Sequence, residues 1–121
     1  MLRDARAEGF SRRHRFTVQG SFGPVLRNSR KLRSPHAVLH VTPGIVGFSR
    51  LGVALTRRLI PSSVDRNAMK RALREAFRKH PVKRAGLDLV VMFRTPIAAA
   101  DRRAIVDEVR GLLDLAAGAH A

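Results

Sequence analysis

The sequence predicts a single α+β domain in which three helices pack on a small mixed sheet of about four strands, in the order α-β-β-β-α-β-α. The length of 121 residues suits one compact domain with a modest core. The segment DLVVMFR (88–94) has the continuous apolar run of a buried strand, and the apolar residues of 65–80 recur at helical spacing. Helices that cover one sheet make a two-layer sandwich.

Two further strands are predicted from alternating, β-branched segments. HAVLHVT (36–42) and RLGVALT (50–56) both have this character. The turn residues of PGIVGFS between them indicate a loop, and an additional short strand is expected within 27–35.

The three helices differ in how strongly their ends are marked. Apolar spacing predicts a first helix over 18–26, although two glycines and a proline oppose it. The run SSVD is a capping signal for the second helix, which should end near Lys79 because the residue before Pro81 is biased out of the helical region. Asp101 is expected to cap the last helix, whose apolar face contains Ile105, Val109, Leu112 and Leu113.

Composition points to a polyanionic partner. The net charge is +15, from 24 basic and 9 acidic residues, and such an excess attracts nucleic acid or an acidic membrane surface. The longest strongly apolar run is far too short to cross a bilayer, and no aromatic-rich amphipathic face suggests membrane binding. The absence of cysteine fits a reducing compartment. We therefore expect a cytoplasmic protein that does not bind membranes.

The segment DRNAMKRALREAFRKH (65–80) carries two adjoining stripes when it is drawn as a helix. At 100° per residue, Met69, Leu73 and Phe77 fall on one side with two alanines. The other side is cationic and consists of Asn67, Lys70, Arg71, Arg74 and Arg78. The apolar stripe should dock on the sheet and leave the cationic stripe displayed.

This cationic stripe is strained in the isolated protein. Basic residues four positions apart form three like-charge pairs between Arg66 and Arg78, and each pair lowers the stability of the helix by roughly 0.2–0.5 kcal/mol. Glu75 should relieve part of this repulsion through Arg71 and Lys79. A merely solvated basic face is the competing interpretation, but the uncompensated series and the amide of Asn67 favour nucleic-acid binding, since arginine forks bind phosphate oxygens.

No group of residues in the sequence has the pattern of a catalytic or metal site. The acidic residues are dispersed, and Asp107 with Glu108 is interpreted as the solvent face of the last helix. His36 and His40 lie too far apart along a strand to share one metal, so structural or stacking roles are expected. We therefore assign no catalytic residue, no metal ligand and no cofactor to the protein alone.

The motif RNAMKRALREAF resembles the signature helix of the protein subunit of bacterial ribonuclease P. RHRF followed by Phe22 and Leu26, RLGVALTRR, and DLVVMFR with the last helix match the flanking order, from about Arg13 to Leu113. The resemblance implies an RNA-binding subunit of a ribonucleoprotein that cleaves precursor tRNA to give the mature 5′ end. It also implies that catalysis resides in a magnesium-dependent RNA subunit, so that the protein is not catalytic without it, and that the crossover around the signature helix is left-handed.

The resemblance also implies which residues bind RNA. Three groups are carried over by position. The face for the catalytic RNA consists of Arg66, Asn67, Lys70, Arg71, Arg74 and Arg78. The cleft for the single-stranded 5′ leader consists of Phe22, Leu26, His40, Arg57 and Arg58, and the N-terminal basic contacts are Arg12, Arg13 and Arg15.

Three positions depart from the pattern of the resembled family. Ala68 stands where an arginine is expected, and His40 stands where an aromatic residue is expected on the strand. The loop LIPSSV replaces a shorter Gly-Asn-containing loop before the signature helix.

The expected organisation is a basic, mobile tail (1–15), the ribonuclease P protein-like domain (16–117) and a short C-terminal tail (118–121). We expect the isolated protein to be a monomer whose partners are the catalytic RNA and precursor tRNA. A different basic RNA-binding scaffold, such as a ribosomal protein, is the alternative, and a self-sufficient nuclease or a DNA-binding protein are further rivals.

Overall fold

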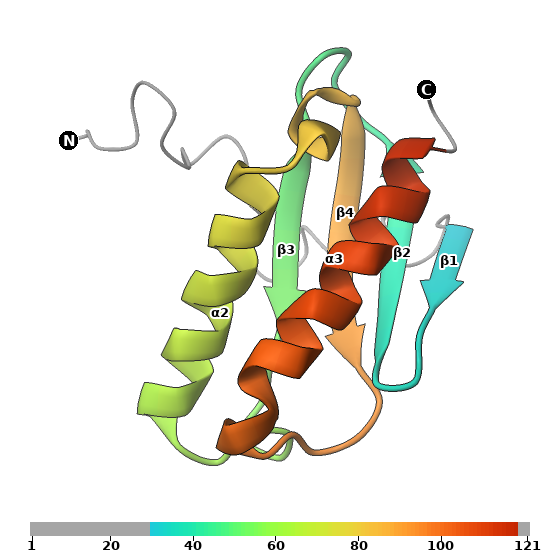
Figure 1. Cartoon of the computed structure of the whole chain (residues 1–121). Coiled ribbons are helices and arrows are strands. Elements are labelled where there is room, and N and C mark those ends of the chain that lie inside the picture. Colours follow the sequence, from blue (N-terminus) through green and yellow to red (C-terminus); the bar gives the residue numbers. More distant parts are fainter. Residues whose placement is uncertain (1–29, 119–121) are drawn as a thin grey trace, which may run out of the picture.

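The computed structural model describes residues 30–118, which form one four-stranded sheet and two α-helices (Figure 1). The elements are β1 (Arg30–Arg33), β2 (Ala37–Pro43), β3 (Arg50–Ala54), α2 (Ser63–Arg78), η2 (Pro81–Arg84), β4 (Leu87–Phe93), η3 (Ala99–Asp101) and α3 (Arg102–Gly118), where η marks a 3-10 helix. The predicted α+β sandwich with a four-stranded mixed sheet is confirmed. The described part contains two α-helices rather than three, because the helix predicted over 18–26 lies outside the described residues.

The strand order is β1-β2-β4-β3, so the last strand in the chain occupies an inner position. β1 and β2 form an antiparallel hairpin, and β2 pairs antiparallel with β4. β3 pairs with β4 in parallel, with Leu51 opposite Leu89 and Val53 opposite Val91. The sheet is therefore mixed, and β4 joins the hairpin to β3.

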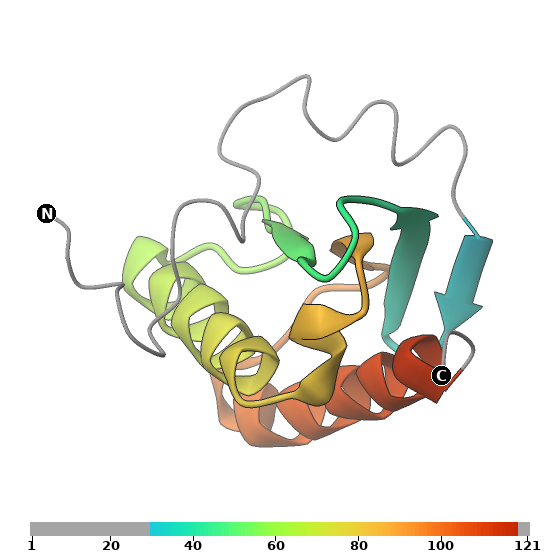
Figure 2. The same cartoon turned by 90° about the horizontal axis from the view of Figure 1, so that it is seen from above.

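The β3-α2-β4 connection is left-handed. In Figure 1, β3 and β4 both run downward, β4 lies to the right of β3, and α2 returns upward in front of the sheet. Figure 2 shows that α2 and α3 cover the same side of the sheet. When the strands are turned to point upward, the chain moves leftward with the helix in front, which is the rare hand for such units.

The hydrophobic core lies between the sheet and the two helices. Because side chains alternate along a strand, the odd-numbered residues of β2 and β4 point to this side. Leu39, Leu89 and Val91 have no exposed surface, and Phe77 of α2 and Leu113 of α3 are 1% exposed. This period-2 pattern fixes the register, since a one-residue slip would turn the apolar set away from the helices.

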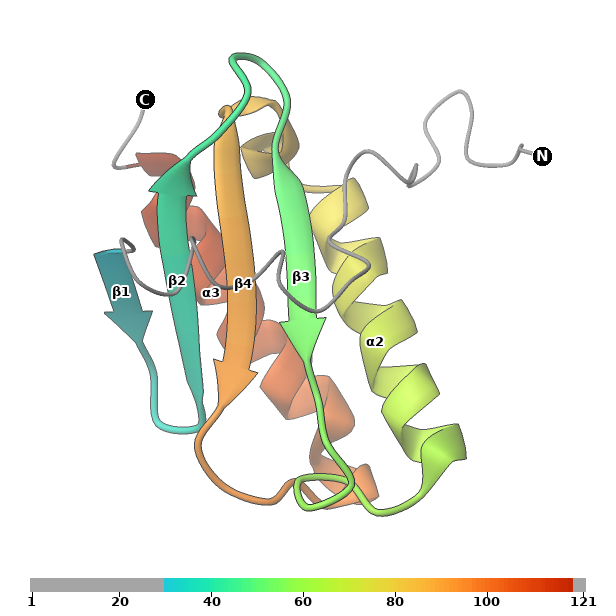
Figure 3. The same ribbon diagram turned by 180° about the vertical axis from the view of Figure 1, so that it is seen from behind.

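The opposite face of the sheet is covered by no helix among the described residues (Figure 3). It carries Val38 and His40 of β2 and Val90 of β4. A bidentate ion pair crosses from β3 to β4 on this face: Arg50 Nε lies 2.9 Å from Asp88 Oδ1, and Arg50 Nη2 lies 2.8 Å from Asp88 Oδ2. The two faces therefore differ in chemistry although they share the same strands.

The helix ends confirm one capping prediction and correct another. The Ser62 side chain accepts a hydrogen bond from the Asp65 amide at 3.3 Å, as the SSVD run predicted for α2. Asp101 was predicted to cap the last helix, but it is the final residue of η3, which leads directly into α3. The helical turn thus begins three residues earlier, after Ala98, where no side chain caps it.

The third strand is shorter than predicted. β3 ends at Ala54, not at Thr56, because the Thr56 carbonyl accepts hydrogen bonds from the amides of Leu59 and Ile60 at 3.1 and 3.0 Å and closes a turn there. Arg57 and Arg58 therefore lie in this turn rather than at the end of a strand.

Candidate nucleic-acid interface

Helix α2 separates its apolar and cationic stripes as the sequence predicts. Met69, Leu73 and Phe77 are each 1% exposed and belong to the core. The opposite stripe meets solvent to differing degrees: Lys70, Arg74 and Arg78 are partly buried, whereas Asn67 and Arg71 are exposed. Burial of one stripe fixes the rotation of the helix and so determines which charges are displayed.

The first turn of α2 is fastened to the loop before it. Arg66 Nη1 donates to the carbonyl oxygens of Ile60 and Pro61, both at 2.9 Å. These bonds offset the unfavourable position of a cation at the positive end of a helix. Arg66 thus has a structural role that the sequence did not indicate, while its Nε and Nη2 donors are not used by the described residues.

The turn between β3 and α2 presents two adjacent cations. Leu59 and Ile60 are buried, and the Leu59 carbonyl accepts a hydrogen bond from the Ile97 amide at 3.0 Å. Arg57 and Arg58 occupy the exposed part of the same turn. Because β3 ends and α2 begins at the same end of the molecule, these arginines lie near the first turn of α2 (Figure 1).

Glu75 is the acidic residue in the second half of α2, and its partners differ from the predicted ones. It binds Arg78, with 3.1 Å from Arg78 Nε to Glu75 Oε1, and lies 3.5 Å from Lys79 Nζ. The hydrogen bond from Arg78 is the main cause that lowers the pKa of Glu75. The predicted pairing of Glu75 with Lys79 is confirmed. The second partner of Glu75 is Arg78 rather than Arg71, so Glu75 does not offset the charge of Arg71.

His40 lies on the sheet face away from the helices, one strand in from the edge. The register places it opposite Lys31 of β1 and Val90 of β4. Burial lowers the pKa of His40, and the charges of Lys31 and Arg33 lower it further. At neutral pH its imidazole is therefore uncharged, which suits stacking on a nucleobase.

Lys31 and Arg33 are basic residues of this face that the sequence reasoning missed. Both are exposed, and the alternation of β1 puts them on the side of His40, with Leu32 on the core side. The signal in the sequence was the alternation RKLR, but the strand was placed only loosely within 27–35, so no face could be assigned.

The structure brings together some of the predicted residues and separates others. Arg57, Arg58 and Arg66 gather at one end of α2, whereas His40 lies on the opposite sheet face, two strands from β3. Five further predicted site residues fall outside the described part of the chain: Arg12, Arg13, Arg15, Phe22 and Leu26.

Glu108 corrects the interpretation of Asp107 and Glu108 as a solvent-facing pair. Asp107 is exposed, but the Glu108 carboxylate accepts hydrogen bonds from the Ser34 hydroxyl and from the His36 amide, the latter at 2.7 Å. Burial alone would raise the pKa of Glu108, but the bonds from Ser34 and His36 outweigh it and lower the pKa. Glu108 therefore holds the β1–β2 turn against α3, and His36, which lies 2.9 Å from it, has a structural role.

Between residues 30 and 118 there is no group of three or more His, Cys, Asp or Glu side chains that could hold a metal ion. Neither helix in that range is long and apolar enough to span a bilayer.

A displayed cationic helix on a mixed α+β sheet is typical of a nucleic-acid-binding protein. The family model described as ribonuclease P matches residues 10–117 of the chain. The ribonuclease P protein component of Nitrosomonas europaea is 38% identical over 96 residues, covering 79% of this chain and 81% of the relative. That of Methylococcus capsulatus is 34% identical over 93 residues, covering 77% and 73%.

A solved structure agrees with these sequence relationships. The ribonuclease P protein of Staphylococcus aureus superposes with a TM-score of 0.70 at 26% identity, covering 85% of this chain and 94% of that one. The chain therefore belongs to the ribonuclease P family, and its function is that of the protein component of this tRNA-processing ribonucleoprotein.

Proposed function

We propose that the cationic stripe of α2 binds the catalytic RNA of ribonuclease P. The observation that carries this proposal is the division of α2 into a stripe anchored in the core by Met69, Leu73 and Phe77 and a stripe that displays Lys70 and Arg71. Neither Lys70 nor Arg71 has a hydrogen bond or ion pair with the described residues. RNA phosphates would supply the counter-charges that the protein does not provide.

The remaining members of this proposed surface have additional roles. Arg66 would bind RNA through the donors that the loop carbonyls leave available, and Asn67 would hydrogen-bond a phosphate or a base edge. Arg74 would extend the stripe, and Arg78 would do so in competition with Glu75. With Ala68 in place of an arginine, binding depends more on these neighbours.

We propose that the single-stranded 5′ leader of precursor tRNA binds along the sheet face that carries His40, together with Phe22, Leu26, Arg57 and Arg58. A neutral imidazole can stack on any base, and arginines bind the backbone, so this combination tolerates varied leader sequences. The lowered pKa of His40 supports the stacking role. Arg12, Arg13 and Arg15 would add backbone contacts.

The chemistry is proposed to reside in the RNA subunit together with magnesium. The described residues offer no carboxylate or imidazole cluster suited to a metal ion. The protein would act by binding and orienting RNA in the cytoplasm, where precursor tRNA is processed. We propose that it is a monomer in isolation.

Reconstitution tests this function. Adding the full chain to the catalytic RNA at low magnesium should increase the rate of precursor tRNA cleavage at the mature 5′ end. The basic side chains of the bound protein would reduce the repulsion between RNA phosphates. No increase over the RNA alone would contradict the proposal.

Two controls distinguish the alternatives. The chain incubated alone with precursor tRNA should give no site-specific cleavage, whereas a self-sufficient nuclease would cut it. A ribosomal-type scaffold would bind RNA but would not stimulate the catalytic RNA.

A further inference from the structure

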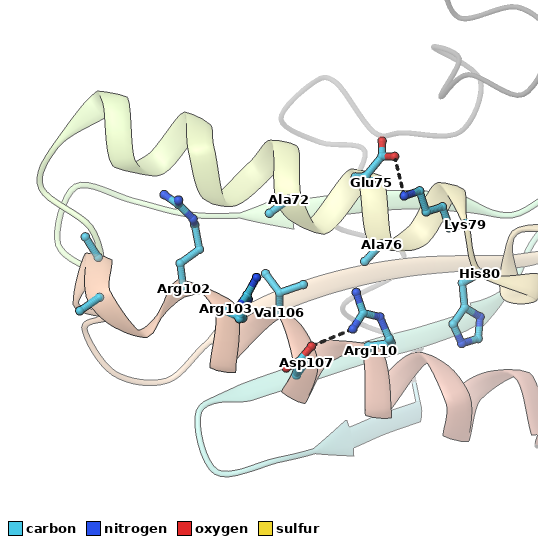
Figure 4. A pocket seen from close by; sticks show the side chains of 12 residues that line it. Ala72, Glu75, Ala76, Lys79, His80, Arg102, Arg103, Val106, Asp107 and Arg110 are labelled. Atoms are coloured by element: carbon cyan, nitrogen blue, oxygen red, sulfur yellow. Dashed lines mark hydrogen bonds and ion pairs between the residues drawn. The ribbon is translucent and has the colours of Figure 1, made fainter.

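A groove of about 880 Å³ runs between α2 and α3 in the helical layer (Figure 4). Ala72 and Ala76 of α2 face Val106 of α3 across it, and two further alanines of η3 line one end. Packed helices approach to about 8–10 Å, and small side chains at the contact leave space above it. The groove therefore follows from the small side chains of α2 and η3 that line it.

The rim of this groove has an excess of positive charge. Four lining residues are basic and two are acidic, which gives a net charge of +2 with His80 counted as neutral. The basic residues are Lys79, Arg102, Arg103 and Arg110, and the acidic ones are Glu75 and Asp107.

Both acidic residues already have basic partners on their own helices. Asp107 Oδ1 lies 2.7 Å from Arg110 Nη1, and Glu75 binds Lys79 and Arg78. Arg102 and Arg103 are exposed and have no ion pair with any described residue. Figure 4 shows Arg102, Arg103 and Arg110 projecting from the α3 side toward the groove. Two arginines thus remain available for an anion.

The spacing of these arginines suits an extended polyanion. Arg110, which Asp107 already pairs, lies seven residues after Arg103, so the two arginines share one face of α3 about 10.5 Å apart along its axis. A row of guanidinium groups that do not converge on one point matches a chain of phosphates better than a single small anion, and each fork can bind phosphate oxygens in bidentate fashion.

The groove lacks the features of a protein-docking site. Protein interfaces depend on large apolar or aromatic anchors in pockets. The exposed large apolar residues of the described chain lie elsewhere: Ile45, Val46, Val64 and Leu115. None of them lines the groove, whose apolar floor consists mostly of alanine.

We propose that the α2–α3 groove is a second RNA-binding surface, which binds the phosphodiester backbone through Arg102 and Arg103. Its lining residues Ala72, Ala76 and Lys79 lie on a different side of α2 from Lys70 and Arg74, by 100° per residue. RNA would therefore contact α2 from two sides. The proposal rests on the family's RNA-binding function but not on the assignment of the cationic stripe of α2.

The test compares the double substitution Arg102→Ala/Arg103→Ala with Arg30→Ala/Arg84→Ala. The control changes the net charge equally at exposed positions outside the groove. Affinity is measured against salt concentration in two arms: full-length protein binding to catalytic RNA, and the reconstituted holoenzyme binding to precursor tRNA. The arm in which the groove variant changes the salt dependence shows whether the groove binds phosphates of the catalytic RNA or of precursor tRNA.

The groove variant should flatten the slope of log K against log salt by about 1.4 in one arm, taking about 0.7 per phosphate. The control should change the slope by less than half as much. Equal slopes for the groove variant and the control in both arms would overturn the proposal. Altered self-association with unchanged RNA binding would overturn it in favour of a protein interface.

A gain-of-affinity substitution provides a second readout that loss of folding cannot imitate. Asp107→Asn removes the acidic partner of Arg110, so RNA should bind several-fold more tightly at low salt if the groove contacts phosphate. Unchanged affinity for both RNAs would contradict the proposal. Lys70→Ala/Arg74→Ala tests the stripe separately, so a failure of either surface can be recognised.

Discussion

Helices α2 and α3 differ in how their charges are compensated, although they have similar length and pack on the same face of the sheet. They contain 16 and 17 residues, and both bury an apolar face. α2 carries five basic and two acidic residues, whereas α3 carries three of each. The two helices thus share one packing role and differ in charge.

The acidic residues of α3 all bind groups within the protein. Asp107 binds Arg110, Glu108 binds the β1–β2 turn, and Asp114 binds His80 Nε2. His80 Nδ1 accepts the Val82 amide at 2.9 Å, so Nε2 carries the proton that it donates to Asp114. The acidic charge of α3 therefore fastens the fold, whereas α2 carries an excess of basic charge and displays Lys70 and Arg71.

The largest expected effects are losses of stability when core side chains of α2 or α3 are truncated. Phe77→Ala should lower the free energy of unfolding by about 3–5 kcal/mol, and Leu113→Ala by about 2–5 kcal/mol, because each leaves a cavity in the core. Urea denaturation followed by circular dichroism measures both. Val64→Ala is the control on α2, since Val64 is 72% exposed and should change stability by less than about 0.5 kcal/mol. A small loss for Phe77→Ala would show that α2 does not depend on this contact.

Glu108 tests whether α3 fastens the fold through charge. Glu108→Ala should cost about 2 kcal/mol, because the Ser34 hydroxyl and the His36 amide lose a charged acceptor. Asp107→Ala is the neighbouring control and should cost less than about 1 kcal/mol, because its ion pair is exposed. Equal losses measured by urea denaturation would remove the distinction between the two carboxylates.

Lys70 and Arg74 test whether α2 carries charge for a partner. The double alanine substitution should flatten the salt dependence of binding to the catalytic RNA by about 1.4. Lys70→Ala alone removes two like-charge pairs and should raise the free energy of unfolding by about 0.4–1 kcal/mol. Weaker RNA binding together with higher stability is the expected combination, and Lys70→Arg should retain the wild-type behaviour. An unchanged salt slope would mean that this stripe is merely solvated.

The smallest expected effect concerns His40. Because the pKa of His40 is lowered in the folded state, the unfolded chain binds a proton more readily, and stability falls as the pH drops below 6.5, the ordinary pKa of histidine. Between pH 7.5 and 5.5, the native protein should therefore lose more stability than His40→Phe. Equilibrium unfolding of both proteins at the two pH values measures this, and an equal loss would show that His40 titrates normally.

The sequence predicted the elements whose patterns are local. The apolar stripe of α2, its Ser62 cap and the buried strand β4 depend on residues close together in the chain, and all three were predicted. The Arg66 contacts with the loop carbonyls and the Glu108 contacts with the β1–β2 turn were not. Such contacts depend on the course of the chain between elements, which periodicity does not encode.

The charged surfaces were likewise predictable from the sequence only where a single element contains all of their residues. The cationic stripe of α2 was predicted because one helix contains all of it. Lys31 and Arg33 were missed because their position beside His40 depends on strand register, and the α2–α3 groove was missed because it combines residues from two helices. Pairings across the sheet and between helices appear only when the tertiary structure is known.

The inner position of β4 has a consequence for synthesis of the chain on the ribosome. β3 has its sole pairing in the described sheet with β4, whose first residue lies 37 positions after the start of β3. As the chain emerges, the β1–β2 hairpin and α2 appear before the strand that joins them. A nascent chain that stops before Leu87 therefore leaves β3 without its partner strand, and the hairpin and β3 can join into one sheet only after β4 has emerged.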